Sequence, residues 1–435
     1  MSSTSVFHSV ENVDAKTTTF TLSPTNVTYA NCLRRSIQSE VSVLGFRADM
    51  TDTGTTTDVK VTKNTTPMSN EMLADRIGLL PIATPKNIES WDKERILFRL
   101  AVENKTEDVM LVTAGMIECL EKVPTSDERV RIPNTQFFHP DPVTGDTCII
   151  AVLKPFVPGQ SPEAIELTAW ATLGKGKEHA RFNPSSQCAY GYTRDTDEAR
   201  IMKRWQEWLI QKKVSIKDLE SDDTRKKQLN NEFRSLEIYR SYKIDAEGEP
   251  YSYDFTVETL GTMSVYDMVY TALIELSKLC EKYTALDVGE LPDNMDIRPA
   301  EGAMKGYDLW FRGEDHTLGS MLQAWIVANT VGEVVDFAGY KIPHPLRKEM
   351  VVRLGVEDSK KFDEKAARYT LAAAAKGLAD MYREWSVEWS VIAAENGRSV
   401  RTEGAVGVKG TEGAVEGGPK KPWEAHAEMK MKAKV

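Results

Sequence analysis

The chain has 435 residues and a formal net charge of −10 at pH 7, with 41% hydrophobic and 28% charged residues. This balance is typical of a soluble globular protein with two or three domains, and it argues against whole-surface binding of nucleic acid while leaving a local basic patch open. There is no run of about 18 apolar residues, and the N-terminus lacks a secretory signal pattern, so we expect no membrane span and no secretion. Five scattered cysteines form neither a disulfide framework nor a paired zinc motif, which favours an intracellular, reducing compartment.

The first predicted elements are a strand at residues 17–22 and a helix at residues 26–41, with Asn26 as the helix N-cap. The helix is predicted because apolar residues recur at three- and four-residue steps, at Val27, Ala30, Leu33, Ile37 and Val41. Arg34 and Arg35 lie on the polar side. Because adjacent residues point about 100° apart on a helix, one arginine can brace its own domain while the other faces outward. Periodicity alone indicates an ordinary amphipathic helix with a solvated polar face.

Short strands dominate the prediction for the next hundred residues, at 43–50, 59–62, 96–102, 109–113 and 147–152. One helix is predicted among them, at residues 70–77, with Gly78 at the C′ position that ends it. Cys119 and Cys148 also lie here, without paired spacing. Because tetrahedral zinc takes four ligands, we interpret both cysteines as ordinary small buried residues.

The glycine-rich stretch at residues 174–177 has the composition of a phosphate-binding loop but not its GxxxxGK(S/T) spacing. His179 has only Glu178 as a neighbouring carboxylate, so a packing or interface role is favoured over that of a general base. Residues 195–240 are highly charged and helical in pattern. Their apolar positions fall on two faces, at Ile201, Trp205, Trp208, Leu209, Leu229, Phe233 and Leu236.

A strand at residues 251–258 and a long helix capped by Ser264 come next, and residues 287–305 predict a linker because they combine glycine, proline and acids without periodicity. Beyond it the pattern of strands and helices begins again, at 307–312, 314–328, 334–337, 350–354 and 363–385, with a loop at 338–346. Asp315, His316 and His344 lack the spacing of helical metal ligands. After residue 397 the composition is low in complexity and predicts disorder.

Three stretches resemble the α-like subunits of cellular RNA polymerases, namely bacterial α, archaeal D and the third-largest eukaryotic subunit. The first resembles the family's signature helix, A-N-(A/S)-L-R-R-hydrophobic-x-x-(S/T)-E-V, with matches at Ala30, Asn31, Leu33, Arg34, Arg35, Ile37, Ser39, Glu40 and Val41. The second, residues 70–82, departs from the family pattern at Asn70 and Asp75, which replace an acid and a histidine. The third resembles A-x-x-G-x-G-x-x-H-A-(K/R)-(W/F)-x-P, with matches at Ala171, Gly174, Gly176, His179, Ala180, Arg181, Phe182 and Pro184.

A second resemblance covers the C-terminal part of the chain. Residues 314–319 and 337–346 are similar to motifs of archaeal L and of the eleventh-largest eukaryotic subunit, with Ser320 in place of the family's asparagine. Together the resemblances imply a D-type and an L-type subunit fused head to tail. Such fusion is a habit of the polymerases of large DNA viruses, so the resemblance also implies a viral origin, with the virion and the host cytoplasm or nucleus as locations.

The fold implied by the resemblance is α+β, with two α-like dimerisation domains in one chain. Each domain has an antiparallel sheet plus two helices, the four helices pack between the halves, and a mostly β domain is inserted in the first. The expected divisions are a D-type domain at 1–46 and 236–285, an inserted domain at 47–235, a linker at 286–304, an L-type domain at 305–396 and a tail at 397–435. The residues expected at the internal dimer interface are Leu33, Ile37, Met268, Leu273, Leu276, Leu318, Leu322 and Trp325.

The implied function is that of an assembly platform in a multisubunit DNA-directed RNA polymerase, a nucleotidyltransferase complex. No catalytic residue is expected in this chain, because nucleotide addition needs clustered carboxylates holding two magnesium ions and no such motif is present. No metal or other cofactor is expected either. Residues expected to contact the second-largest subunit are Arg34, Arg35, Glu40, Lys177 and His179. The largest subunit and small zinc-binding subunits are further expected partners, with DNA reached only through the assembled complex and no membrane contact.

Two alternatives stay open on the sequence alone. A stand-alone nucleotide-processing enzyme would use residues 174–179 and 314–316. A DNA-binding transcription regulator would use the basic residues Lys175, Lys177 and Arg181.

Overall fold

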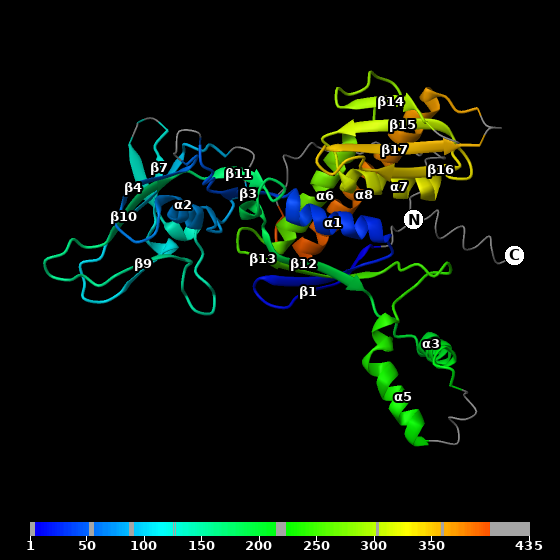
Figure 1. The fold of residues 1–435 in the computed structure, drawn as a ribbon, viewed down its shortest axis with the longest axis horizontal. Coiled ribbons are helices and arrows are strands. Elements are labelled where there is room, and N and C mark those ends of the chain that lie inside the picture. Colours follow the sequence, from blue (N-terminus) through cyan, green and yellow to red (C-terminus); the bar gives the residue numbers. More distant parts are fainter. Residues whose placement is uncertain are drawn as a thin grey trace.

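The computed structural model describes residues 5–51, 56–86, 91–124, 126, 128–214, 223–301, 304–357 and 361–400. Within these ranges the chain forms seven α-helices and five antiparallel sheets, so the predicted α+β class is confirmed (Figure 1). The predicted tail lies outside the described residues from position 401 onward. None of the described helices combines the length and the apolar character needed to cross a membrane.

The first four-stranded sheet joins distant parts of the chain in the order β1 (Phe7–Asn12), β2 (Thr17–Leu22), β13 (Tyr253–Thr259) and β12 (Ser185–Tyr192). The predicted strand at residues 17–22 is confirmed as β2. The sequence did not reveal β1, because only Phe7 of this strand is fully buried and no alternation is visible. The β12 strand corrects the expected boundaries of the inserted domain, 47–235, because it pairs with β13 in the first sheet.

Two helices cover this sheet, α1 (Val27–Ser39) and α6 (Val265–Glu281). Both start as predicted: the side chain of Asn26 accepts a hydrogen bond from the Thr28 N–H at 2.8 Å, and Ser264 Oγ accepts one from the Asp267 N–H at 3.1 Å. The predicted apolar face of α1 is wrong at Val27, which is 38% exposed. The buried face instead includes Tyr29, Cys32 and Ser36.

The inserted region is built around a five-stranded sheet in the order β4 (Val59–Asn64), β10 (Ala164–Ala169), β5 (Ile96–Glu103), β7 (Glu118–Lys122) and β8 (Arg129–Ile132). Two smaller sheets pair β6 (Met110–Thr113) with β9 (Ile149–Leu153), and β3 (Ser42–Gly45) with β11 (Thr172–Lys175). A separate hydrophobic cluster forms the core of this region. Short 3₁₀ helices lie at Ala114–Met116, Asn134–Gln136, Ala180–Phe182 (η4) and Glu237–Arg240.

The predicted helix of the inserted region is α2 (Asn70–Gly78), and the predicted role of its last glycine is wrong. Gly78 is the final helical residue rather than a left-handed C′ residue. It is needed for space: a Cβ atom here would lie 2.7 Å from Arg181 Nη1 and 3.1 Å from the backbone oxygen of Phe46. The glycine therefore permits close packing of α2 on the rest of the chain.

Residues 193–214 and 223–248 form a projection that is termed the arm. Its helices are α3 (Glu198–Gln211) and α5 (Asp223–Ser235), which stand away from both four-stranded sheets (Figure 1). The arm has its own small cluster, in which the buried residues are Trp208, Leu209 and Phe233. Leu236, predicted on an apolar face, is 64% exposed.

The second four-stranded sheet has the order β14 (Met295–Pro299), β15 (Lys305–Arg312), β17 (Glu349–Val356) and β16 (Phe337–Lys341), with helices α7 (His316–Asn329) and α8 (Glu364–Glu395). Three predictions are corrected here. The expected linker at 286–304 contributes β14 to the sheet. The strand expected at 334–337 begins at Phe337 and runs to Lys341, into the predicted loop at 338–346. The α8 helix runs ten residues past residue 385.

The helices α1, α6, α7 and α8 form a layer between the two four-stranded sheets (Figure 1). This layer is termed the junction. The α8 helix reaches the first sheet, where the Trp389 ring lies 4.9 Å from Phe7 and 5.0 Å from Phe20, centroid to centroid, and the indole N–H donates to the Tyr266 oxygen at 3.0 Å. One hydrophobic cluster spans both halves, and it buries all eight residues expected at the internal interface: Leu33, Ile37, Met268, Leu273, Leu276, Leu318, Leu322 and Trp325.

Candidate functional site

Five residues are expected to contact the second-largest subunit. All of them except His179 lie on or beside the C-terminal half of α1, where this helix meets the segment after β11 and the start of α7. The first is Arg34, which is half-buried and held along its own helix. Its Nε and Nη2 donate to Asn31 Oδ1 at 3.1 and 3.0 Å, and its Nη1 donates to Gln38 Oε1 at 2.9 Å. These three polar side chains, one helical turn apart, form a fixed row on the surface of α1.

Arg35 turns the other way and joins the two halves of the chain. Its Nε donates to Thr317 Oγ1 at 3.1 Å, and its Nη2 lies 4.0 Å from Asp315 Oδ2, both at the start of α7. Asp315 caps α7 by accepting from the Thr317 N–H at 2.8 Å. The adjacent arginines therefore do diverge, and Arg35 is the one that braces the fold.

A cluster of ion pairs continues from Arg35 across the junction. Lys177 Nζ lies 3.1 Å from Asp315 Oδ2 and 3.4 Å from Glu40 Oε1, so one ammonium group links α1 to α7. Lys175 Nζ lies 2.5 Å from Glu275 Oε2 on α6 and 3.7 Å from Glu40 Oε2. The four elements α1, β11, α6 and α7 are thereby connected through charged side chains.

The contacts within this cluster shift the pKa values of Lys177 and Asp315. Burial opposes ionisation of Lys177, but the carboxylates of Glu40 and Asp315 outweigh it and raise the pKa of the ammonium group. Burial likewise opposes ionisation of Asp315, but the Thr317 N–H and Lys177 outweigh it and lower the pKa of the carboxyl. Both groups are therefore charged well on either side of pH 7.

The glycine-rich loop serves packing against α1. A Cβ atom on Gly176 would lie 2.0 Å from the Gln38 oxygen, and the next N–H, of Lys177, donates to the Ser39 oxygen at 3.0 Å. At Gly174 a Cβ atom would lie 2.6 Å from the ring of Phe182. The glycines thus allow a close backbone approach to the end of α1, rather than presenting free N–H groups to a phosphate.

His179 is exposed and acts as the cap of η4. Its Nδ1 accepts from both the N–H and the Nε of Arg181, each at 3.1 Å. The neighbouring Glu178 is engaged elsewhere, with Arg47 Nε and Nη2 each donating at 2.8 Å. The Arg181 side chain is only 6% exposed and donates to the Phe46 oxygen at 2.9 Å. Within the described residues, the hydrogen bonds of the His179 imidazole are therefore to Arg181, and the ring makes no bond to the charged side chains of the junction cluster.

The potential metal ligands remain apart. His316 Nδ1 lies 3.3 Å from the Tyr340 hydroxyl, and His344 Nδ1 accepts from the Leu346 N–H at 3.2 Å. Cys119 is buried, which raises the pKa of its thiol to about 12, whereas Cys148 is exposed. No group of three or more His, Cys, Asp or Glu side chains in the described part of the chain is placed to hold a metal ion. The expectation of no bound metal stays a prediction.

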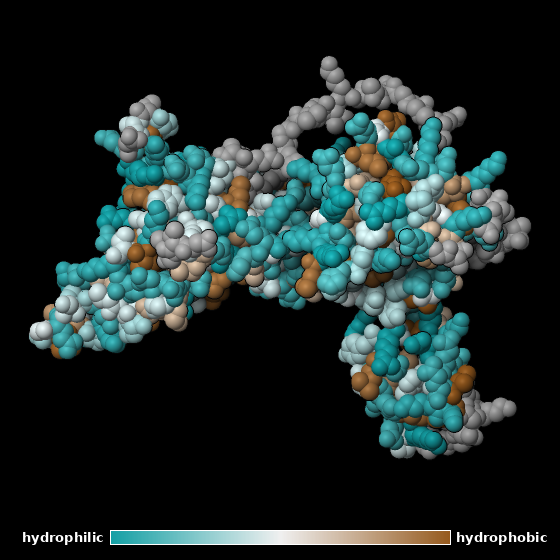
Figure 2. Space-filling view, turned by 45° about the horizontal axis from the view of Figure 1, so that its top comes forward, coloured by the Kyte–Doolittle hydropathy of each residue, from teal (hydrophilic) through white to brown (hydrophobic). Residues whose placement is uncertain are grey.

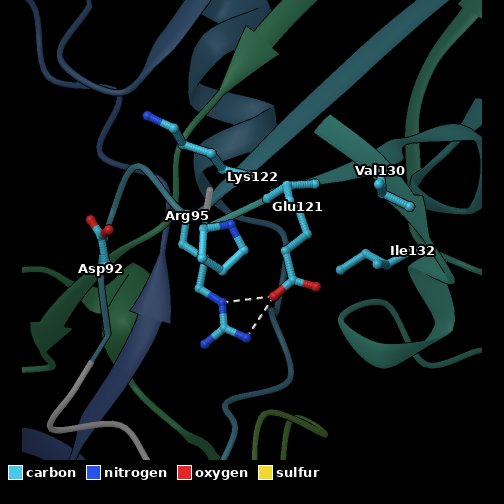
Figure 3. Close-up of a pocket in the computed structure, with 8 residues that line it drawn as sticks. Asp92, Arg95, Glu121, Lys122, Val130 and Ile132 are labelled. Atoms are coloured by element: carbon cyan, nitrogen blue, oxygen red, sulfur yellow. Dashed lines mark hydrogen bonds and ion pairs between the residues drawn. The ribbon is translucent and has the colours of Figure 1, made fainter. Parts of the chain in front are cut away.

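A cavity of about 790 Å³ opens beside β7 and β8, away from the junction (Figure 3). Its lining includes Asp92, Arg95, Glu121, Lys122, Val130 and Ile132. Arg95 Nε donates to Glu121 Oε1 at 2.7 Å, so the two central charges neutralise each other. The cavity contains none of the residues that the sequence singled out for catalysis.

The sequence missed the carboxylate and hydroxyl partners of the junction cluster. Asp315 and Thr317 lie within the family motif at residues 314–319, but Asp315 was considered only for a metal or enzyme site, Thr317 was given no role, and Glu275 carried no signal. The Arg35–Thr317 hydrogen bond joins residues 282 positions apart. Only the fold brings such residues together.

Comparison with known proteins identifies a matching family and several relatives. Residues 307–387 match the family described as the RNA polymerase Rpb3/Rpb11 dimerisation domain. The chain is 26% identical over 275 residues to DNA-directed RNA polymerase subunit Rpo3 of Pyrococcus horikoshii, covering 61% of this chain and 91% of that protein. Rpo3 of Thermococcus kodakarensis is 24% identical over 271 residues, with the same two shares.

A eukaryotic relative is also found. The rpac1 subunit of DNA-directed RNA polymerases I and III from Dictyostelium discoideum is 26% identical over 172 residues, which cover 37% of this chain and 45% of that protein. The chain therefore carries an Rpb3/Rpb11-type α-like domain and is homologous to archaeal Rpo3 subunits.

Proposed function

We propose that the chain is a non-catalytic assembly-platform subunit of a multisubunit DNA-directed RNA polymerase, with D-type and L-type partners fused in one polypeptide. Homology to Rpo3 supports the platform role. The observation that carries the fusion is the junction, in which residues from both ends of the chain share one buried hydrophobic cluster. The family match at 307–387 and the 61% of the chain that aligns with Rpo3 are consistent with this division.

The polar row on α1 is the proposed contact for the second-largest polymerase subunit. Arg34 suits this role because its guanidinium is already oriented by Asn31 and Gln38, so little side-chain entropy would be lost on binding. Glu40, Lys177 and His179 would flank it. The largest subunit and small zinc-binding subunits complete the proposed partner set. An origin in a large DNA virus is part of the proposal and rests on the habit of subunit fusion in such polymerases.

Neither alternative function gains support from the geometry. For an enzyme, residues 174–179 and 314–316 would have to converge on a free reactive group. Instead Glu314 Oε1 accepts from the Tyr283 hydroxyl at 3.0 Å, and Asp315 is engaged by Lys177. For a DNA-binding regulator, Lys175 and Lys177 would have to be available for phosphates, but both are paired with carboxylates inside the chain.

Capture of the second-largest subunit by the co-expressed chain tests the proposal. Arg34→Ala should weaken capture at least tenfold, while the free protein should keep its free energy of unfolding within about 0.5 kcal/mol, because this side chain bonds only to its own helix. Arg99→Ala, on β5 of the inserted region, is the matched control and should leave capture unchanged. Normal capture by Arg34→Ala would contradict the docking assignment, and failure of the wild-type chain to join any polymerase subunit would contradict the function.

A further inference from the structure

The root of the arm contains a polar groove that the platform role does not use. Its volume is about 270 Å³, and it lies between the start of α3 and the segment at 240–248 that returns toward the first sheet. The residues that bear on its chemistry are Arg200, Lys203, Arg204, Arg240, Ser241 and Tyr242. The arm projects away from the rest of the molecule (Figure 2), and the groove is lined by residues of α3, by Asp195 ahead of it and by the segment at 240–248.

The groove carries an excess of positive charge. Arg200 is bound by the buried carboxylate of Asp195, with Nη2 donating to Oδ1 at 2.8 Å, and is thereby neutralised and held in place. Arg204 has only a long contact of 4.0 Å with Glu207. Lys203 makes no ion pair within the described residues. Two neighbouring, exposed cations of α3 that line the groove therefore lack strong partners within the described residues.

A buried hydroxyl adds a second, independent sign of a missing ligand. Ser241 is 9% exposed, and its backbone is fully used: the N–H donates to the Ile238 oxygen at 3.1 Å, and the oxygen accepts from the Asp195 N–H at 3.0 Å. Its Oγ, however, has no hydrogen-bond partner among the described residues. Burying a hydroxyl without a partner is unfavourable, and because Ser241 lines the groove, rotation of its side chain toward a ligand oxygen there would resolve the deficit.

Two tyrosines lie in or next to the segment that lines the groove. Tyr242, in the groove, is stacked on Tyr192 with ring centroids 4.7 Å apart. Tyr239 is 61% exposed, and the Arg194 guanidinium lies 4.2 Å from its ring centroid. Proteins that bind single strands combine basic grooves that follow the phosphates with exposed rings on which bases stack.

We propose that this groove binds the phosphate backbone of single-stranded nucleic acid. Lys203 and Arg204 supply the charge, the Ser241 hydroxyl donates to a phosphate oxygen, and Tyr239 offers a face to an adjacent base. This goes beyond the proposed function, in which DNA is reached only through other subunits, because the chain gains a direct contact of its own. Capture of the second-largest subunit does not depend on it, so either proposal can fail alone.

The test measures fluorescence anisotropy of a labelled single strand of about 16 nucleotides with the full-length chain at about 50 mM salt. We expect the wild type to bind and the double variant Lys203→Glu/Arg204→Glu to bind at least tenfold more weakly. For this variant, the slope of log affinity against log salt concentration should be smaller in magnitude by about 1.4. Two phosphate contacts are removed, and each contributes about 0.7 to the slope. Ser241→Ala should weaken binding several-fold without changing this slope.

The matched control is Lys105→Glu/Lys154→Glu, which makes the same charge change on two exposed lysines of the inserted region. It should weaken binding less than twofold, and all variants should melt near the wild-type temperature. The proposal is overturned by absence of wild-type binding, or by equal losses in the double variant and the control. Competition by a mononucleotide or inorganic phosphate that is as effective as competition by the strand, at equal phosphate concentration, would also overturn it. So would polyglutamate binding with the same affinity as the strand and the same dependence on Lys203 and Arg204.

Discussion

The junction and the groove at the root of the arm differ in how their charged side chains are paired. In the junction, the cations of Arg35, Lys175 and Lys177 each meet a carboxylate or hydroxyl group from another element. In the arm, Lys203 makes no ion pair within the described residues, and Arg204 has only a distant partner. Charges satisfied within the chain indicate structure, whereas charges left open indicate a surface for something else.

The same contrast holds for apolar burial. The junction buries large rings such as Trp385 and Trp389 in a cluster that spans both halves. The cluster of the arm has three buried residues, and side chains such as Met202 and Ile210 are exposed beside it. The junction should therefore carry the global stability of the chain, and the arm should open on its own at a lower cost.

Removing a junction ring is expected to have the largest effect on stability. Trp389→Ala should lower the free energy of unfolding by about 3–5 kcal/mol, because the ring is fully buried against Phe7 and Phe20. Urea denaturation followed by far-UV circular dichroism measures the change. The control Trp205→Ala, in the arm, should leave the main transition in place. Equal shifts of that transition would show that the arm and the junction unfold as one unit.

Closing the space at the glycine-rich loop should have an intermediate effect. Gly176→Ala places a Cβ atom against the Gln38 oxygen and should cost about 1–3 kcal/mol of stability, because backbone must move to accommodate it. Gly191 is the matched control: it lies in β12, and a Cβ atom there would meet nothing within 4 Å. If Gly176→Ala folds normally and has the same melting temperature as the wild type, the close approach of this loop to α1 does not contribute to stability.

Neutralising the carboxylate at the start of α7 should have the smallest effect and a definite pH dependence. The folded-state pKa of Asp315 lies below its unfolded value, so its charge stabilises the fold above the unfolded pKa of about 3.9, and this contribution is lost as the pH falls through the folded pKa. In Asp315→Asn the cap is kept and the charge removed. The free energy of unfolding of this variant should be lower than that of the wild type by a constant amount from about pH 5 to 8. The difference should shrink below about pH 4.

Urea titrations at a series of pH values measure this difference. A deficit that persists unchanged into acid would mean that the carboxylate charge contributes nothing to the junction, contrary to the Lys177 and Arg35 contacts.

The elements predicted well from the sequence are those whose own residues encode them. The α1 and α7 helices follow from apolar spacing, α1 also follows from its capping side chain at Asn26, and β2 follows from its β-favouring threonines. The strands β1, β12 and β14 were missed because they lie at the edges of their sheets, where one neighbour is absent and the burial pattern is weak. Their pairing is set by tertiary contacts rather than by local preference.

Only part of the candidate site could be predicted from the sequence. Arg34, Arg35 and Glu40 stood out through a family motif, and Lys177 stood out as a basic residue inside another, yet nothing local could tell which of them point outward. The structure separates them, because Arg35 and Lys177 reach across to α7, whereas Arg34 stays on α1. No sequence motif marks the groove at the root of the arm. Its key feature is the buried Ser241 hydroxyl without a partner among the described residues, which only the three-dimensional structure reveals.

The central claim, that the two halves form one obligate partnership, is tested most directly by cutting between them. A protease site is best inserted between Gly289 and Glu290, ahead of β14, because this strand pairs within the second sheet and must stay with it. Obligate interfaces typically bury about 2,000 Å² or more, whereas a short tether only raises the effective concentration to roughly millimolar. After cleavage the two fragments should therefore elute together from a sizing column at micromolar concentration. Fragments that separate, each monomeric and folded, would contradict the account.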